Sequence, residues 1–205
     1  MYILFRVVIT IFTCAISLLL FKKALNLRNN IKIILIVALN ISVLISLYFL
    51  PFENLMIDFD TPQSAYSYMN GFNSNVVLEV DGKESVFVVE NEEGIYKYSI
   101  ISKSENGYKL STSVNTKKIL QDKKNDLTIS VYRYKNTDDY YVVIFNTGGS
   151  KINVFDNKGS IFVMLEETNK VLDQTFTTYY AYVQNFDQSY DVFLEETGDG
   201  SVSPK

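Results

Sequence analysis

The acidic residues of this chain all lie in one part of the sequence. The 23 aspartates and glutamates occur at or beyond Glu53, whereas residues 1–52 carry only positive charges. Those first residues form two apolar stretches, 1–21 and 33–52, joined by the basic segment 22–32. A chain divided in this way is predicted to fold as two units, a helical hairpin within a membrane and a polar domain that follows it.

The second apolar stretch predicts a transmembrane helix. Ile33 to Phe52 is a run of 20 residues without a charge, and at about 1.5 Å of rise per residue it spans the roughly 30 Å hydrocarbon core. The first stretch contains Arg6, and an arginine one turn from a helix end can extend to the lipid headgroups. A signal peptide would need a basic start and a small-residue cleavage site, and neither element is convincing here. We therefore expect two spans.

The connecting segment sets the expected orientation. Lys22, Lys23, Arg28 and Lys32 lie in it without any acid, and positive charge in short loops resists transfer across the membrane. The loop is therefore expected in the cytoplasm, with the N-terminus and the acidic part on the outer side, an N-out and C-out arrangement in the cell membrane. The lipid bilayer is the first expected partner.

Small polar residues in the two stretches predict contact between the helices. The first stretch has such residues at spacings of three and four, and the second has three more: Thr10, Thr13, Cys14 and Ser17, then Asn40, Ser42 and Ser46. Hydrogen bonds between helices are the expected use of such residues. No aspartate, glutamate, lysine, arginine or histidine lies in 7–21 or 33–52, which argues against an ion or proton path.

The part after the hairpin is predicted to be one extracytoplasmic β-rich domain, 61–196, between a juxtamembrane connector, 53–60, and a flexible tail, 197–205. One short helix is expected at its start, because Thr61 and Pro62 can begin a helix and Asn70-Gly71 can end it. Runs of β-branched and aromatic residues separated by turn signals then predict an antiparallel meander or sandwich. The expected strands are Val76–Val80, Glu84–Glu90, Ile95–Ser102, Tyr108–Val114, Leu127–Lys135, Tyr140–Asn146, Lys151–Phe155, Ile161–Glu166, Phe176–Gln184 and Tyr190–Glu195.

The order of apolar residues predicts which strands are central. Tyr140 to Phe145 and Ile161 to Leu165 are apolar or aromatic throughout, which is typical of strands buried on both faces. In Leu127 to Val131, apolar residues alternate with Thr128 and Ser130, which predicts one face in water.

The residue types exclude several kinds of chemistry. The chain has no histidine, and its single cysteine, Cys14, lies in the first apolar stretch. The commonest general base, the commonest zinc ligand and disulfides are therefore missing from the β-rich domain. From Glu53 onward there are 23 acidic and 14 basic side chains, a formal charge of −9, which argues against a nucleic-acid partner.

Three kinds of candidate site can each be explained by a function or by their role in the fold. Adjacent acids could act in glycoside hydrolysis, or they are solvated charges at strand ends: Glu92-Glu93, Asp138-Asp139, Glu166-Glu167 and Glu195-Glu196. Asp156 to Ser160 resembles the start of a calcium loop, but it lacks the distal carboxylate and is better explained as a turn. A tyrosine-rich set could bind a ligand or fill the core: Tyr132, Tyr134, Tyr140, Tyr141, Tyr179, Tyr180 and Tyr182.

The segment Phe59 to Tyr68, with the hairpins 95–114 and 131–141, resembles a group of small membrane-anchored proteins of Bacillus-like Gram-positive bacteria. The likeness covers roughly Asp58 to Glu166. It implies a cell-envelope setting, and it carries over no catalytic or binding residue.

Together these features predict a non-enzymatic membrane-anchored protein whose outward β-domain binds, senses or protects at the cell envelope. One alternative is a carboxylate-dependent hydrolase of cell-wall polymers, which needs two acids facing each other roughly 5 to 10 Å apart in an open cleft. Another is an accessory subunit of a membrane complex, with a membrane or cell-surface protein as its partner. No catalytic, cofactor-binding or metal-binding residue is assigned, and no cofactor is expected.

Overall fold

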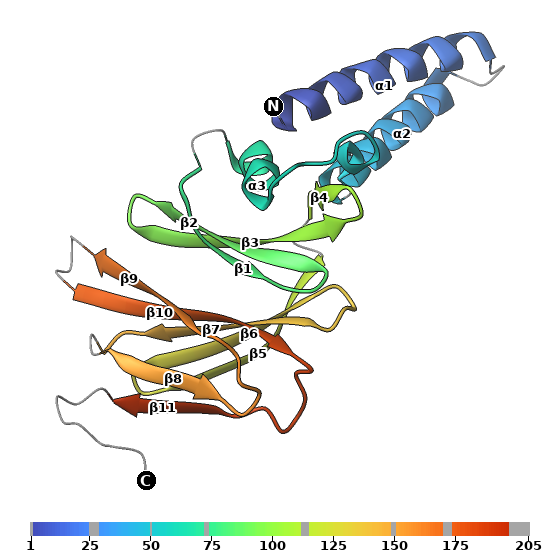
Figure 1. Cartoon of the computed structure of the whole chain (residues 1–205). Coiled ribbons are helices and arrows are strands. Elements are labelled where there is room, and N and C mark those ends of the chain that lie inside the picture. The colour runs from blue at the N-terminus through green and yellow to red at the C-terminus, as the bar shows by residue number, and fades with distance from the viewer. Residues whose placement is uncertain are drawn as a thin grey trace.

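The computed structural model describes residues 2–24, 29–49, 51–71, 74–111, 115–148, 151–169 and 174–196. The helices are α1 (Tyr2–Ala24), α2 (Asn29–Phe49), the short 3₁₀ helix η1 (Phe52–Leu55) and α3 (Pro62–Asn70). The strands after them form antiparallel sheets (Figure 1). The expected order, helices at the N-terminus followed by a mainly antiparallel β-region, is therefore confirmed. The expected tail, 197–205, lies outside the described residues.

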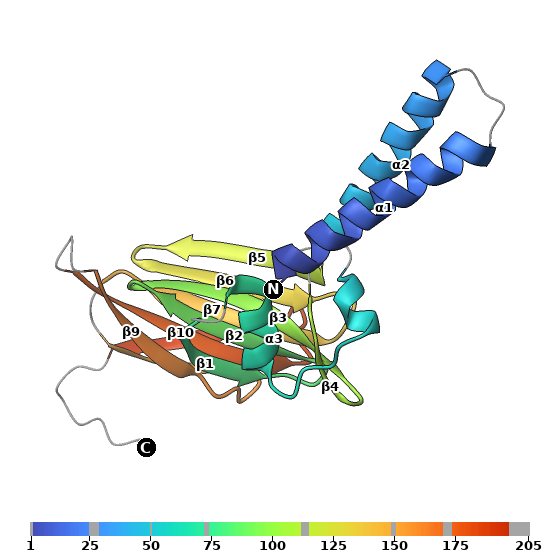
Figure 2. The same ribbon diagram turned by 90° about the horizontal axis from the view of Figure 1, so that it is seen from above.

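The two long helices lie side by side and antiparallel (Figures 1 and 2). Asn40 Nδ2 on α2 donates to Ser17 Oγ on α1 at 3.1 Å, which confirms the predicted polar contact between the helices. Most of the described apolar side chains point outward, including Leu4, Phe12 and Leu19, each more than 65% exposed. The hairpin therefore presents an apolar surface to its surroundings.

The helix bounds differ from the apolar stretches that predicted them. α1 continues to Ala24 and α2 begins at Asn29, so most of the basic segment expected to be a loop is helical. Within α2, Asn30–Leu47 is long and apolar enough to cross a membrane by length and composition, whereas the apolar stretch of α1, Leu4–Leu20, is shorter. The same composition is found in signal sequences, so two spans stay a prediction.

The strands fall into three sheets. The first sheet contains β1 (Val76–Asp81), β2 (Ser85–Glu92), β3 (Ile95–Ser104) and β4 (Gly107–Lys109), in that order. The second sheet has the order β5-β6-β7-β10-β9, made of β5 (Thr116–Lys124), β6 (Leu127–Tyr134), β7 (Asp139–Asn146), β10 (Gln174–Gln184) and β9 (Val163–Asn169). The third is a pair, β8 (Ile152–Asp156) with β11 (Val192–Glu196).

The sheets stack as layers, with α3 on the outer face of the first sheet and the third sheet beneath the second (Figure 1). Three apolar clusters fill the spaces between them. Val86 and Val88 pack towards α3, whereas Phe87 and Val89 on the same strand pack towards the second sheet. This alternation follows from the period of two along a strand, and it makes β2 buried on both faces.

Layering also corrects two predictions about burial. β7 is central and buried, as predicted. β9 is an edge strand instead of a central one, and Ile161 just before it is 82% exposed. Ser130 on β6 is buried because its face meets the first sheet, so the expected wet face of this strand is wrong.

β5 has no counterpart among the predicted strands. Its sequence is mostly lysine and polar residues, and its side chains are exposed at nearly every position. It lies at the edge of the second sheet and pairs only with β6. Lysines on an edge strand discourage further pairing, which explains a strand that lacks the apolar alternation of the others.

Candidate functional site

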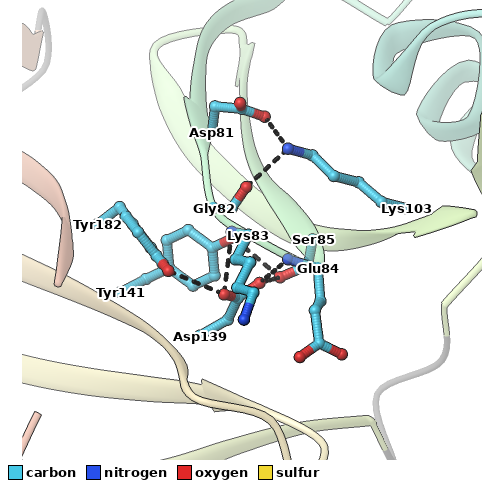
Figure 3. Close-up of polar contacts among 9 residues, drawn as sticks. All are labelled: Asp81, Gly82, Lys83, Glu84, Ser85, Lys103, Asp139, Tyr141 and Tyr182. Atoms are coloured by element: carbon cyan, nitrogen blue, oxygen red, sulfur yellow. Dashed lines mark hydrogen bonds and ion pairs between the residues drawn. The ribbon is translucent and has the colours of Figure 1, made fainter. Parts of the chain in front are cut away.

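A buried carboxylate, Asp139, joins the first two sheets (Figure 3). It begins β7 and is 1% exposed. Its Oδ1 accepts from the Lys83 amide at 3.0 Å, and its Oδ2 accepts from the Glu84 amide at 2.7 Å. Both amides belong to the turn between β1 and β2. A carboxylate on the second sheet therefore holds a turn of the first sheet.

Two hydroxyl groups complete this arrangement. Ser85 Oγ donates to Asp139 Oδ2 at 2.8 Å and lies 2.9 Å from the Tyr141 hydroxyl. Gly82 passes so close that a Cβ there would overlap with the Tyr141 hydroxyl. The close approach explains why the turn has glycine at this position. We call Gly82, Lys83, Glu84, Ser85, Asp139 and Tyr141 the Asp139 clamp.

Tyr182 connects the clamp with a groove on the surface. Its hydroxyl donates to Asp139 Oδ1 at 3.1 Å. Burial, together with the Asp139 charge, raises the pKa of Tyr182 to about 12. The tyrosine therefore stays a neutral hydrogen-bond donor across the physiological pH range, and its ring forms a fixed wall of the groove.

The groove has a volume of 440 Å³ and runs between the edge of β1 and the segment that follows β8. Its polar lining comes from three elements: Glu79 and Asp81 of β1, Tyr182 and Gln184 of β10, and Lys158 and Ser160 before β9. We call it the rim groove. Its size matches that of small-ligand sites, roughly 300 to 1,000 Å³, and its charges of both signs suit a polar ligand.

Ion pairs hold several groove side chains in place. Lys158 Nζ bonds Asp187 Oδ2 at 2.7 Å, and Asp81 Oδ1 lies 2.6 Å from Lys103 Nζ. The Lys158 ion pair is the main reason that the pKa of Asp187 falls to about 2. Partial burial, with the nearby Asp81 charge, raises the pKa of Glu79.

The turn expected to resemble a calcium loop forms one side of the rim groove. Asp156 Oδ1 accepts from the Lys158 amide at 3.0 Å and from the Ser160 amide at 2.8 Å. Burial would raise the pKa of Asp156, but hydrogen bonds from the side chain and amide of Ser160, from Tyr190 and from the Lys158 amide outweigh it and lower the pKa. The carboxylate thus closes a turn, and the part of the chain that the structure describes contains no cluster of metal-binding side chains.

A second polar site lies where the hairpin meets the β-domain. Arg6 of α1 donates to Glu53 of η1, with Nε 3.1 Å from Oε1, and it also bonds the Leu47 carbonyl of α2. Glu53 is 1% exposed. Arg6 was expected to extend towards headgroups, but it turns to this buried carboxylate. We call Arg6, Leu47 and Glu53 the junction.

The connector after the junction is bonded to β4. Asn54 exchanges two hydrogen bonds of 2.8 Å with the backbone of Leu110, and Phe59 pairs with Tyr108 through backbone bonds of 3.0 and 2.8 Å. Lys109 adds bonds to the Asn54 and Ile57 carbonyls. The segment 53–60 is therefore bonded to the β-domain at Asn54, Ile57 and Phe59.

The remaining sequence candidates are dispersed. Of the acidic pairs, Glu92 bonds Lys97 and Glu166 bonds Lys151. Glu92 and Glu93 line a separate groove, and Glu166 is not among the lining residues of the rim groove. The tyrosine set fills the cores instead of forming a binding face, because all of its members except Tyr182 are buried. Sequence reasoning missed Glu79 as a groove residue and treated Lys158 only as part of a turn, since the groove brings together segments that are far apart in the sequence.

Comparison of the chain with protein-family models, curated proteins and solved structures found no match. The resemblance to membrane-anchored proteins of Bacillus-like bacteria stays a prediction. What the chain binds is therefore inferred from its own residues, in particular those of the rim groove and the junction.

Proposed function

We propose that the chain is an integral membrane protein that holds its β-domain on the outer side of the cell membrane and binds a polar partner there through the rim groove. The junction is the observation that supports the membrane part of this proposal. Its ion pair joins an acidic domain to the end of an apolar hairpin through a carboxylate that is 1% exposed. Such a contact favours a β-domain that is held in one orientation relative to the membrane, and argues against a β-domain joined to the helices by a flexible linker.

The junction also favours a chain that keeps its first helix. Arg6 lies in the segment that signal-peptide processing would remove, and its loss would leave Glu53 buried without this cation. An unpaired buried charge costs several kcal/mol. The mature protein is therefore expected to retain residues 2–24, which intact-mass measurement of the membrane-bound protein tests.

Cysteine labelling tests the orientation. In a Cys14→Ser background, Asn125→Cys places a thiol in the exposed turn between β5 and β6, and Asn26→Cys places one between the two helices. A membrane-impermeant maleimide applied to intact cells is expected to label the first variant alone, and both after permeabilisation. Labelling of Asn26→Cys in intact cells would reverse the proposed orientation.

Photocrosslinking tests the rim groove as the binding site. A photoreactive amino acid at Gln184, inside the groove, is expected to capture a partner in intact cells, whereas the same group at Ile95, which is 65% exposed and outside the groove, is not. Equal capture at both positions would contradict the groove as the site. A captured integral membrane protein that also co-purifies with the unmodified chain would favour the accessory-subunit role.

One observation favours the second candidate, a carboxylate-dependent hydrolase. Two acids, Glu79 and Asp81, line the rim groove, and the raised pKa of Glu79 is a property of general acids. The Asp81–Lys103 ion pair weighs against it, because it occupies the second carboxylate. Release of fragments from labelled cell-wall polymer by the wild-type chain, abolished by Glu79→Gln, would support the hydrolase over the binding protein.

A further inference from the structure

An apolar groove lies beside the junction, at the end of the helical hairpin. It has a volume of 460 Å³. Phe5 and Ile9 of α1, Ser42 and Ser46 of α2, and Phe52 and Leu55 of η1 are among its lining residues. Ser42 and Ser46 are one helical turn apart and small, so they leave a hollow between the larger side chains. We call it the junction groove.

The lip of the junction groove is the most exposed apolar part of the connector. Leu55 is 84% exposed and Met56 is 78% exposed. They line the groove together with Phe5 of α1 and Val43 of α2, and both helices carry further exposed apolar side chains, such as Val8 on α1 and Leu44 on α2. Apolar side chains that are exposed together in this way mark a surface that is covered by another apolar phase or partner.

The polar groups next to the junction groove indicate where it would lie in a lipid bilayer. Arg6 and Glu53 follow the lining residues Phe5 and Phe52 in sequence, and they form an ion pair of 3.1 Å. Beyond η1, Asp58 pairs with Lys109 at 2.8 Å. The change from apolar to charged side chains therefore falls within the few residues that follow Phe52, which is the pattern expected at the boundary between hydrocarbon and headgroups.

We propose that the junction groove holds a phospholipid acyl chain of the outer leaflet, and that Leu55 and Met56 insert into that leaflet beside it. This inference rests on the proposed membrane location. Lipid is the chosen occupant because the groove is continuous with the apolar surface of the hairpin, which a bilayer would cover. The contact adds a third membrane attachment to the two helices and fixes the height of the β-domain above the membrane.

Tryptophan fluorescence tests the insertion, because the chain contains no tryptophan. Leu55→Trp reports on the lip, Leu39→Trp on the middle of α2, and Ile161→Trp on an 82% exposed position of the β-domain. The full chain is reconstituted in vesicles whose phospholipids carry bromine on the acyl chains. We expect quenching and blue-shifted emission for Leu55→Trp and Leu39→Trp, and neither for Ile161→Trp.

The outcomes separate this inference from the proposed function. Quenching of Leu39→Trp without quenching of Leu55→Trp would overturn the insertion and leave the membrane location standing. Absence of quenching at Leu39→Trp would contradict the membrane location itself. Two results together would identify a second copy of the chain, and not lipid, as the partner of this surface: Leu55→Trp is not quenched by brominated lipid, and a photocrosslinker at Leu55 joins two copies of the chain.

A plugged variant tests the acyl-chain site. Ser46→Phe fills the hollow, whereas Ile34→Phe adds the same ring at a 66% exposed position of α2 outside the groove. Native mass spectrometry of protein released from nanodiscs is expected to show retained phospholipid on the wild type and on Ile34→Phe, and its loss on Ser46→Phe. Equal lipid retention by both variants would overturn the site.

Discussion

Two adjacent aspartates show how strongly the surroundings decide the role of a residue. Asp138 has a side chain that is 82% exposed and lies 3.9 Å from Arg133. Asp139 is 1% exposed and accepts bonds from two backbone amides, Ser85 and Tyr182. Asp138 lies in the turn before β7, whereas Asp139 is the first residue of the strand, so one carboxylate meets water and the other meets the first sheet.

Replacing Asp139 by alanine is expected to destabilise the β-domain by about 3 kcal/mol, because the Lys83 and Glu84 amides lose their acceptor and a buried unsatisfied donor costs about 1 to 3 kcal/mol. Asp138→Ala is the matched control and should change stability by less than about 0.5 kcal/mol. Urea unfolding of the full chain in detergent micelles measures both. Equal effects of the two variants would contradict the clamp.

Buried and partly buried tyrosines are expected to make stability fall at alkaline pH. Burial is the main cause that raises the pKa of Tyr182 from 10.0 to about 12, and the pKa values of Tyr66, Tyr141 and Tyr190 are raised as well. The folded state holds these phenols in their neutral form, whereas the unfolded chain ionises them near pH 10. The contribution of the neutral phenols to folding stability is therefore complete below pH 10 and is lost as the pH rises towards 12.

Unfolding midpoints measured over this alkaline range test that direction. Tyr182→Phe removes one titrating group and should make the decline with pH shallower. Tyrosinate absorbance can follow the ionisation directly, because tryptophan is absent. A stability that is constant through this range in the wild type would refute the expectation.

At the scale of elements, the sequence predicted those that depend on local signals. The helix at 62–70 forms as expected, with Thr61 and Ser64 bonded reciprocally in a capping box. β5 was missed because an edge strand gains its order from pairing with β6, and its own residues carry no alternation. β9 was taken as central because its apolar residues do not reveal how many neighbouring strands lie beside it.

Two glycines, Gly94 in a turn and Gly107 at the start of β4, offer a test of close packing between elements. Gly107 has φ +142° and a Cβ there would overlap with the Phe59 carbonyl, whereas Gly94 has φ +88° and open space around it. Gly94→Ala should cost about 1 to 2 kcal/mol from backbone strain alone. Gly107→Ala should cost clearly more, since it also forces apart the Phe59–Tyr108 pairing. Urea unfolding of both variants decides this, and equal costs would count against the packed connector.

At the scale of the whole molecule, the contact between hairpin and β-domain could not be read from the sequence. Arg6 and Glu53 are separated by 47 residues, and no periodicity relates them. The sequence did separate the two units, because charge and hydropathy change sharply at Glu53. The rim groove was equally hidden, since its lining comes from β1, β10 and the segment after β8, which meet only when the sheets stack.

The junction ion pair is expected to be strongly coupled. Glu53→Ala leaves Arg6 without its buried carboxylate and should cost about 3 kcal/mol or more, and Arg6→Ala leaves Glu53 in the same condition. A double-mutant cycle in detergent micelles should therefore give a coupling well above that of the exposed pair Lys151–Glu166, which is expected below about 1 kcal/mol. Similar coupling for the two pairs would mean that the junction does not hold the units together.

The strand order of the second sheet sets the order in which this domain can fold. β10 lies between β7 and β9, and β9 pairs only with β10. β7 therefore keeps one open edge until residues 174–184 have been synthesised. A chain interrupted before that point exposes the backbone of its most apolar strand, so completion of the domain depends on β10, near the end of the domain, and an unfinished copy is a substrate for aggregation or proteolysis.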